Sequence, residues 1–190
     1  MSARHQNYPE LGSEVRLPAA LWRSSLRTLR DYGALKSEGL VYLAGVVAAP
    51  KQMVVTSVLA LGHQAQGGTV VVTKEEARWL LRTLRSRDEK LFAQVHSHAG
   101  AAFHSGGDDD HATSFHTGFL SVVVPRFGSG IERIEQCAVH EYRKGRFEEL
   151  PAEDVARRFD IFDPEVDRGP PPRAVQPPWW SWRRYAKRPR

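Results

Sequence analysis

The stretch LFAQVHSHAGAAFHSGGDDD, residues 91–110, contains the pattern that decides the fold of this chain. Its first half is apolar and predicts a buried strand that ends at His96 and His98. Residues two apart on a strand point to the same side, so both imidazoles can reach one metal ion. The second half predicts the start of a helix, with Ser105 as the N-cap and Asp108 in the first turn, where the helix dipole favours a carboxylate.

These side chains predict a metal site of the hydrolytic kind. Two imidazoles and one carboxylate form a three-ligand zinc site, in which the fourth position stays open for water. A lone pair of histidines, or a run of aspartates, is common on protein surfaces and indicates little by itself. Their combination is specific, and it predicts a metallohydrolase.

The pattern resembles a known family, the JAMM (MPN+) zinc metallopeptidases of the JAB type. The family signature is a glutamate on an early strand, then His-Ser/Thr-His-Pro, a short loop and Ser-x-x-Asp. Here these elements read Glu38 at the start of EGLVYLAG, His96-Ser97-His98-Ala99, and Ser105-Gly106-Gly107-Asp108. The resemblance covers roughly residues 20 to 150, and a short form with a basic tail is similar to the prokaryotic branch that acts on ubiquitin-like proteins.

Two departures from the family pattern affect the predicted site. Ala99 replaces the usual proline, which should loosen the loop after the second histidine, because alanine does not fix φ. The loop also has one residue fewer than the family spacing. If the spacing from His98 is kept, the aspartate ligand is Asp109 and Gly106 takes the place of the serine. If Ser-x-x-Asp is kept, the ligand is Asp108.

The residues that follow favour Asp108. Ala112 and Phe115 lie four and seven residues after it, on one apolar helical face. Nearby, His104 and His111 flank the aspartates and could substitute as ligands, and we assign them no role.

The resemblance implies a role for each site residue. His96, His98 and Asp108 would hold Zn²⁺, which lowers the pKa of a bound water to about 7. Glu38 would act as general acid/base, taking a proton from the water and delivering it to the leaving amine. Ser105 would help to hold the oxyanion, in competition with its role as a helix N-cap.

The resemblance also implies a substrate class. The expected reaction is hydrolysis of the peptide or isopeptide bond after the C-terminus of a ubiquitin-like protein, in precursor processing or deconjugation. Expected partners are that protein or its conjugates and, as in related bacterial conjugation or antiviral defence operons, ubiquitin-activating-like and conjugating-like enzymes. Two alternatives stay open: a metallopeptidase that acts on a sulfur-carrier protein or short peptide, and a non-catalytic MPN scaffold.

The expected fold is α/β, a single JAB/MPN domain in which helices flank a mixed central sheet in a cytidine-deaminase-like arrangement. We predict an N-terminal extension at 1–17, the domain at 18–165 and a basic tail at 166–190. Hydrophobic periodicity and capping signals predict two helices, from Pro18 to about Tyr32 and, after a capping box at Thr73 and Glu76, to about Ser86. The predicted strands are Leu40–Val47, Val54–Leu61, Val70–Val72, Leu91–His98, Leu120–Val124, Glu135–Tyr142 and Arg146–Leu150.

Composition indicates a soluble globular chain. Its 190 residues are 41% hydrophobic and 26% charged, which suits one domain with a sizeable core. Cys137 is the sole cysteine, which excludes a disulfide framework and favours a reduced compartment; we expect it to pack in the core. Because the N-terminus has no secretory h-region and no window is long enough for a membrane span, we expect a cytoplasmic protein.

Positive charge is concentrated at the C-terminal end. From Arg168 onward there are seven basic residues and no acidic one, whereas the net charge of the whole chain is +5. The same segment is rich in proline and contains three tryptophans, which favours an extended appendage. Basic and aromatic residues together can bind nucleic acid. Because the aromatics are clustered, we favour docking to the domain itself or to a protein partner.

Overall fold

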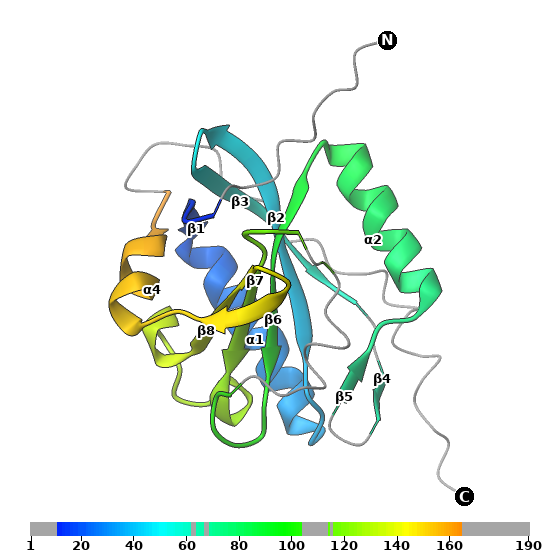
Figure 1. Cartoon of the computed structure of the whole chain (residues 1–190). Coiled ribbons are helices and arrows are strands. Elements are labelled where there is room, and N and C mark those ends of the chain that lie inside the picture. The colour runs from blue at the N-terminus through cyan, green and yellow to red at the C-terminus, as the bar shows by residue number, and fades with distance from the viewer. Residues whose placement is uncertain (1–10, 62–63, 67–68, 104–113, 115, 165–190) are drawn as a thin grey trace, which may run out of the picture.

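The computed structural model describes residues 11–61, 64–66, 69–103, 114 and 116–164. An eight-stranded mixed sheet curls through the domain in the order β10-β1-β3-β2-β6-β7-β8-β9 (Figure 1). Its strands are β1 (Glu14–Pro18), β2 (Leu40–Ala49), β3 (Gln52–Ala60), β6 (Lys90–Ser97), β7 (Leu120–Val124), β8 (Ala138–Arg143), β9 (Arg146–Glu149) and β10 (Phe159–Phe162). A separate hairpin consists of β4 (Gln64–Gln66) and β5 (Thr69–Val71), and the helical segments are α1 (Ala19–Ala34), α2 (Lys74–Arg87), η1 (Pro125–Gly128), η2 (Ile134–Gln136) and α4 (Ala152–Arg158).

The helices cover both faces of the sheet. Apolar side chains of α1 and α4 share one core with one face of the sheet, and this core includes Leu26, Leu29 and Val155. Leu80 and Leu84 of α2 belong to a second core on the other face. Figure 1 shows α2 on the right of the sheet, apart from α1 and α4. This layering is the helix-flanked α/β arrangement that the sequence predicts.

Most of the predicted elements are confirmed. The predicted helices correspond to α1 and α2, and the capping box of α2 forms: Glu76 N–H donates to Thr73 Oγ1 and Thr73 N–H donates to the Glu76 carboxylate. β7 has its predicted bounds. Lys144 and Gly145 form the β8–β9 turn with φ of 51° and 86°, the left-handed pair that a two-residue hairpin favours.

Other parts of the prediction need correction. The sequence predicts an extension through residue 17, whereas Glu14–Pro18 form β1, which lies between β10 and β3 in the sheet. The predicted strand from Glu135 begins only at Ala138, because Ile134–Gln136 form the short helix η2. β4, α4 and β10 have no counterpart among the predicted elements. The predicted helix at Ser105, and the basic tail, lie outside the described residues.

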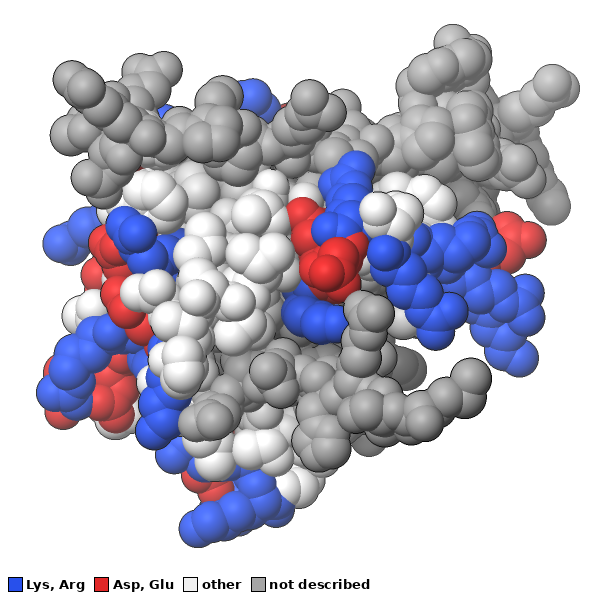
Figure 2. All heavy atoms as spheres, turned by 90° about the horizontal axis from the view of Figure 1, so that it is seen from above, with Lys and Arg blue, Asp and Glu red and all other residues white. Residues whose placement is uncertain are grey.

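The surface of α2 is more basic than the charge of the whole chain suggests. Lys74, Arg78, Arg82 and Arg85 are all exposed, at spacings that place them on one side of the helix. Figure 2 shows lysine and arginine gathered on the right of the molecule, where α2 lies in Figure 1. Summing charge over the chain hides this local concentration.

Within the described residues, no helix combines the length and the apolar character that crossing a membrane requires.

Candidate metal centre

The two histidines lie where the spacing predicts, at the end of β6. Their side chains are buried, with 5% of His96 and 7% of His98 exposed. The ring centroids are 5.1 Å apart and the ring planes meet at 51°. Two imidazoles on one tetrahedral zinc, with Zn–N bonds of about 2.1 Å, would have centroids roughly 5 Å apart. The structure thus brings the two imidazoles to a spacing that suits shared coordination.

Strand pairing brings the start of β2 to the histidine end of β6. Leu40 at the start of β2 is the antiparallel partner of His96, and the pairing continues one residue further, where Ser97 N–H donates to Gly39 O over 3.0 Å. Extending this register by one more residue would set Glu38 opposite His98. Opposed residues of an antiparallel pair lie on the same face of the sheet. Glu38 is half-buried, and this register would place it on the face that carries the histidines, although it is distant from them in sequence.

The Ser97 side chain links the end of β6 to the residue just before β2. Its side chain is fully buried, and Ser97 Oγ accepts a hydrogen bond from Gly39 N–H over 3.0 Å. Gly39 approaches α1 so closely that a Cβ would lie 3.0 Å from side-chain atoms of Leu29 and Tyr32. The glycine and the serine therefore hold the start of β2 against the end of β6. Sequence reasoning noted Ser97 only as the residue between the histidines.

Hydrogen bonds from η1 hold the backbone around His98. His98 N–H donates to Val124 O, Phe127 N–H donates to His98 O, and Arg126 N–H donates to Gly100 O, all over 2.9 to 3.0 Å. The sequence predicts a looser loop because Ala99 replaces proline. In the structure these bonds, on both sides of Ala99, restrain the backbone that a proline would otherwise restrict.

The helix α1 in turn fixes η1. Arg30 Nε donates to Gly128 O and Arg30 Nη2 donates to Ile131 O, each over 2.8 Å. Gly33 lies against Phe127, where a Cβ would come within 2.3 Å of the phenylalanine Cβ. Hydrogen bonds and packing therefore connect α1, through η1, to the backbone of His98.

The remaining predicted site residues lie outside the described residues. These are Ser105 and the two aspartate candidates, Asp108 and Asp109. Among the residues that the structure does describe, no group of three or more histidine, cysteine, aspartate or glutamate side chains could hold a metal ion. The third ligand and the oxyanion residue thus remain predictions from the sequence. The two imidazoles that the structure brings together, His96 and His98, are ligands that suit zinc.

Phe103 is a site residue that sequence reasoning missed. Its ring meets that of His98 edge to face, with centroids 5.1 Å apart, and 57% of the residue is exposed. An exposed aromatic ring beside a buried histidine offers an apolar contact to a bound peptide. The available signal was an aromatic residue five positions after His98, within the loop that the metal motif brackets.

Burial shifts the pKa of two other titratable groups, Cys137 and His116. Burial, together with the nearby Glu135, raises the pKa of the Cys137 thiol to about 12. Cys137 packs against the main core, which confirms its predicted packing role, and the raised pKa keeps it an unreactive thiol. Burial also lowers the pKa of His116 to about 4, and its Nδ1 lies 2.6 Å from Ser114 Oγ. His116 is therefore neutral at physiological pH.

Comparison with known proteins identifies the family. "Probable metalloprotease y4jG" of Sinorhizobium fredii is 32% identical to this chain over 139 residues, which span 70% of this chain and 85% of the relative. The chain belongs to the JAMM/MPN-type metalloproteases. No model of a known protein family matches the sequence.

A solved structure shares the fold of this JAMM/MPN-type chain. The solution structure of protein DSY2949 from Desulfitobacterium hafniense matches with a TM-score of 0.60 over 78% of this chain and 93% of that protein. The two are 17% identical, so the likeness concerns the fold. It confirms the predicted α/β architecture with its mixed sheet.

The two aspartate candidates can be separated by substitution. We expect Asp108→Asn to lower the zinc content and abolish cleavage, and Asp109→Asn to have the milder effect. The reason is the Ser-x-x-Asp spacing of the family signature, which predicts Asp108 as the ligand and Asp109 as a solvated neighbour. Zinc content and cleavage rate, measured on the same preparations, decide between them. The reverse ranking would show that the spacing from His98 determines the third ligand.

Proposed function

We propose that this metalloprotease is a zinc-dependent isopeptidase or peptidase that cuts after the C-terminus of a ubiquitin-like protein. The observation that carries the proposal is the pairing of Leu40 with His96, because continuing this register would bring Glu38 to the face of the sheet that bears His96 and His98. A carboxylate next to two metal-binding imidazoles is the minimum that water-dependent peptide hydrolysis requires. The family signature in the sequence supplies the substrate class.

The residues divide the chemistry among them. His96, His98 and Asp108 would hold the zinc ion. When bound, this ion supplies Lewis acidity, which makes a water molecule acidic and polarises the scissile carbonyl. Glu38 accepts the proton of the attacking water and then donates it to the departing amine, so the amine leaves neutral. Ser105 donates a hydrogen bond to the carbonyl oxygen as negative charge develops there.

The structure offers an edge for an extended substrate tail. β3 ends at Ala60, whose partner is Val41, next to the Leu40–His96 pair, so the chain leaves β3 at the histidine end of the sheet. β4 begins four residues later, at Gln64, and with β5 forms a two-stranded sheet whose outer edges have no strand partner within the described residues. An extended peptide can add to such an edge through main-chain hydrogen bonds. This mode suits a flexible C-terminal tail whose side chains are small.

The partners would be a ubiquitin-like protein or its conjugates, together with the activating-like and conjugating-like enzymes of the same system. The exposed ring of Phe103 beside His98 supports a peptide substrate, because it provides an apolar contact next to the predicted cleavage point. The exposed cations of α2 provide a further contact surface for an acidic partner.

A panel of linear fusions tests the substrate class. Each fusion joins a ubiquitin-like protein ending in two glycines to a reporter, and a sulfur-carrier fusion and an isopeptide-linked conjugate complete the panel. We expect cleavage directly after the terminal glycine, abolished by a chelator and restored by zinc. Mass spectrometry locates the cut. A fusion in which alanine-valine replaces the two glycines is the matched control. Cleavage of the control at the same rate, or of no ubiquitin-like fusion at all, would overturn the proposal.

A further inference from the structure

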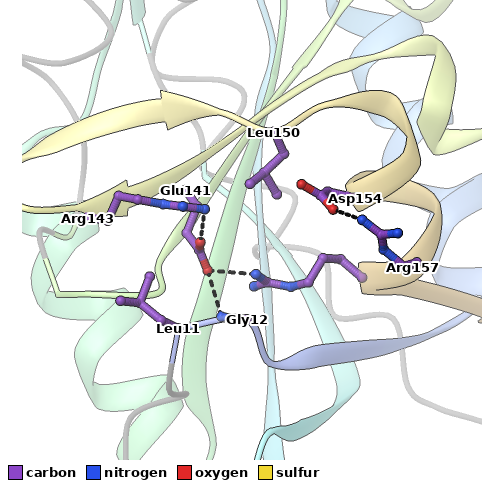
Figure 3. A pocket seen from close by; sticks show the side chains of 8 residues that line it. Leu11, Gly12, Glu141, Arg143, Leu150, Asp154 and Arg157 are labelled. Atoms are coloured by element: carbon purple, nitrogen blue, oxygen red, sulfur yellow. Dashed lines mark hydrogen bonds and ion pairs between the residues drawn. The ribbon is translucent and has the colours of Figure 1, made fainter.

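A pocket lies on the face of the sheet opposite the histidines. It has a volume of about 460 Å³ and is formed by the segment before β1, by β8, by Leu150 after β9, and by α4 (Figure 3). Glu141 in this pocket pairs with Leu120 of β7, whereas His96 pairs with Val123. These two β7 residues are three apart, and side chains on a strand alternate between faces. The pocket is therefore separate from the candidate metal centre.

Glu141 organises the pocket. Its side chain is 1% exposed and accepts hydrogen bonds from Gly12 N–H over 3.2 Å, from Arg158 Nη1 over 2.7 Å and from Arg143 Nη2 over 2.5 Å. Figure 3 shows these contacts converging on the carboxylate. Arg157 pairs with Asp154 at the rim. Three guanidinium groups thus line a pocket that contains two carboxylates, and outside the lining Glu148 also pairs with Arg143.

Two N–H donors of Arg158 have no acceptor. The Arg158 side chain is 9% exposed, and its Nε and Nη2 are buried without a hydrogen-bond partner. Arg143 Nε makes no hydrogen bond either, but it lies 3.6 Å from Glu148 Oε2 in an ion pair. These statements concern the part of the chain that the structure describes. Buried donors without an acceptor are costly, and charged donors are the costliest. Glu141 already receives three hydrogen bonds, so a further acceptor has to come from elsewhere.

We propose that this pocket binds the oxyanion of a small molecule, a phosphate or a carboxylate. Arginine forks present parallel N–H groups that match the oxygens of either group. The buried Arg158 donors supply N–H groups for such an anion, and the volume lies within the range of small-molecule sites, about 300 to 1,000 Å³. The proposal is independent of the substrate class of the metal centre, because the pocket occupies the other face of the sheet.

NMR titration of the isotope-labelled full chain tests the proposal. Inorganic phosphate is added in one arm and succinate in the other, at constant ionic strength maintained with sodium chloride. We expect saturable shifts of the Arg143 and Arg158 Nε–Hε signals and of the Gly12 amide. Saturation by phosphate alone, or by succinate alone, supports the proposal and identifies the anion. If neither saturates, the proposal fails.

Variants test whether the anion binds in this pocket. Arg157→Gln removes a rim cation without touching Glu141 and should weaken binding roughly tenfold or more, as should Arg143→Gln. Arg146→Gln is the matched control, since Arg146 is 74% exposed on β9 and does not line the pocket. Its affinity should equal that of the unmodified chain. Equal weakening in all three variants would indicate general charge attraction and would overturn the site.

Discussion

Replacing Glu38 with glutamine should leave zinc bound and reduce peptide hydrolysis by about 10²- to 10⁴-fold, the usual contribution of a general acid/base. Glutamine preserves the shape of the side chain at the start of β2 but cannot accept a proton. The measurement is cleavage of a linear fusion with a ubiquitin-like C-terminus, run beside metal analysis of the same preparation. The variant should also trap its substrate, because the metal and the binding surface survive.

Glu75→Gln provides the control for removing a carboxylate. Glu75 is an exposed residue in the first turn of α2, outside the predicted site, and its loss should leave turnover unchanged. Near-normal turnover of Glu38→Gln with zinc present would exclude Glu38 from the mechanism. Loss of zinc from that variant would instead make Glu38 a ligand or a folding residue.

Removing either histidine should remove the metal. We expect about one zinc per chain in the unmodified protein and none in His96→Ala or His98→Ala, because two remaining ligands are too few to hold it. Elemental analysis measures the content. A chelator should lower the melting temperature of the unmodified protein and leave that of both variants unchanged, since only a bound metal contributes linkage stability.

His140→Ala controls for the loss of a buried histidine. His140 lies on β8, is 6% exposed, and has no predicted role at the metal. This variant should be less stable and should keep its zinc. If His96→Ala and His98→Ala both retain full zinc, the proposed centre is wrong.

The sequence predicts the local parts of the site well. The alternation of β6 indicates that His96 and His98 share a side, and the structure confirms their proximity. Local rules do not determine strand register, however, because β2 and β6 are far apart in the chain. The expectation that Glu38 lies near His98 therefore rests on the family resemblance, and the Leu40–His96 pairing is consistent with it.

Short elements at the sheet margin escaped prediction for a similar reason. The segment EVRLP alternates polar and apolar residues, as β1 requires, yet five residues with two charges are a weak signal without neighbouring strands. The Glu141–Arg158 ion pair joins residues of β8 and α4 that no sequence motif connects. Such features depend on the curl of the sheet, which brings Gly12, just before β1, to Glu141 of β8.

The position of β2 and β6 in the middle of the sheet has a consequence for how the metal is acquired. Each of these strands has a neighbour on both sides, so their amides should be among the last in the domain to exchange with solvent. The two imidazoles would then be in place before any ion arrives. Loading should need little ordering of the chain, unlike in small zinc modules that fold only around their ion.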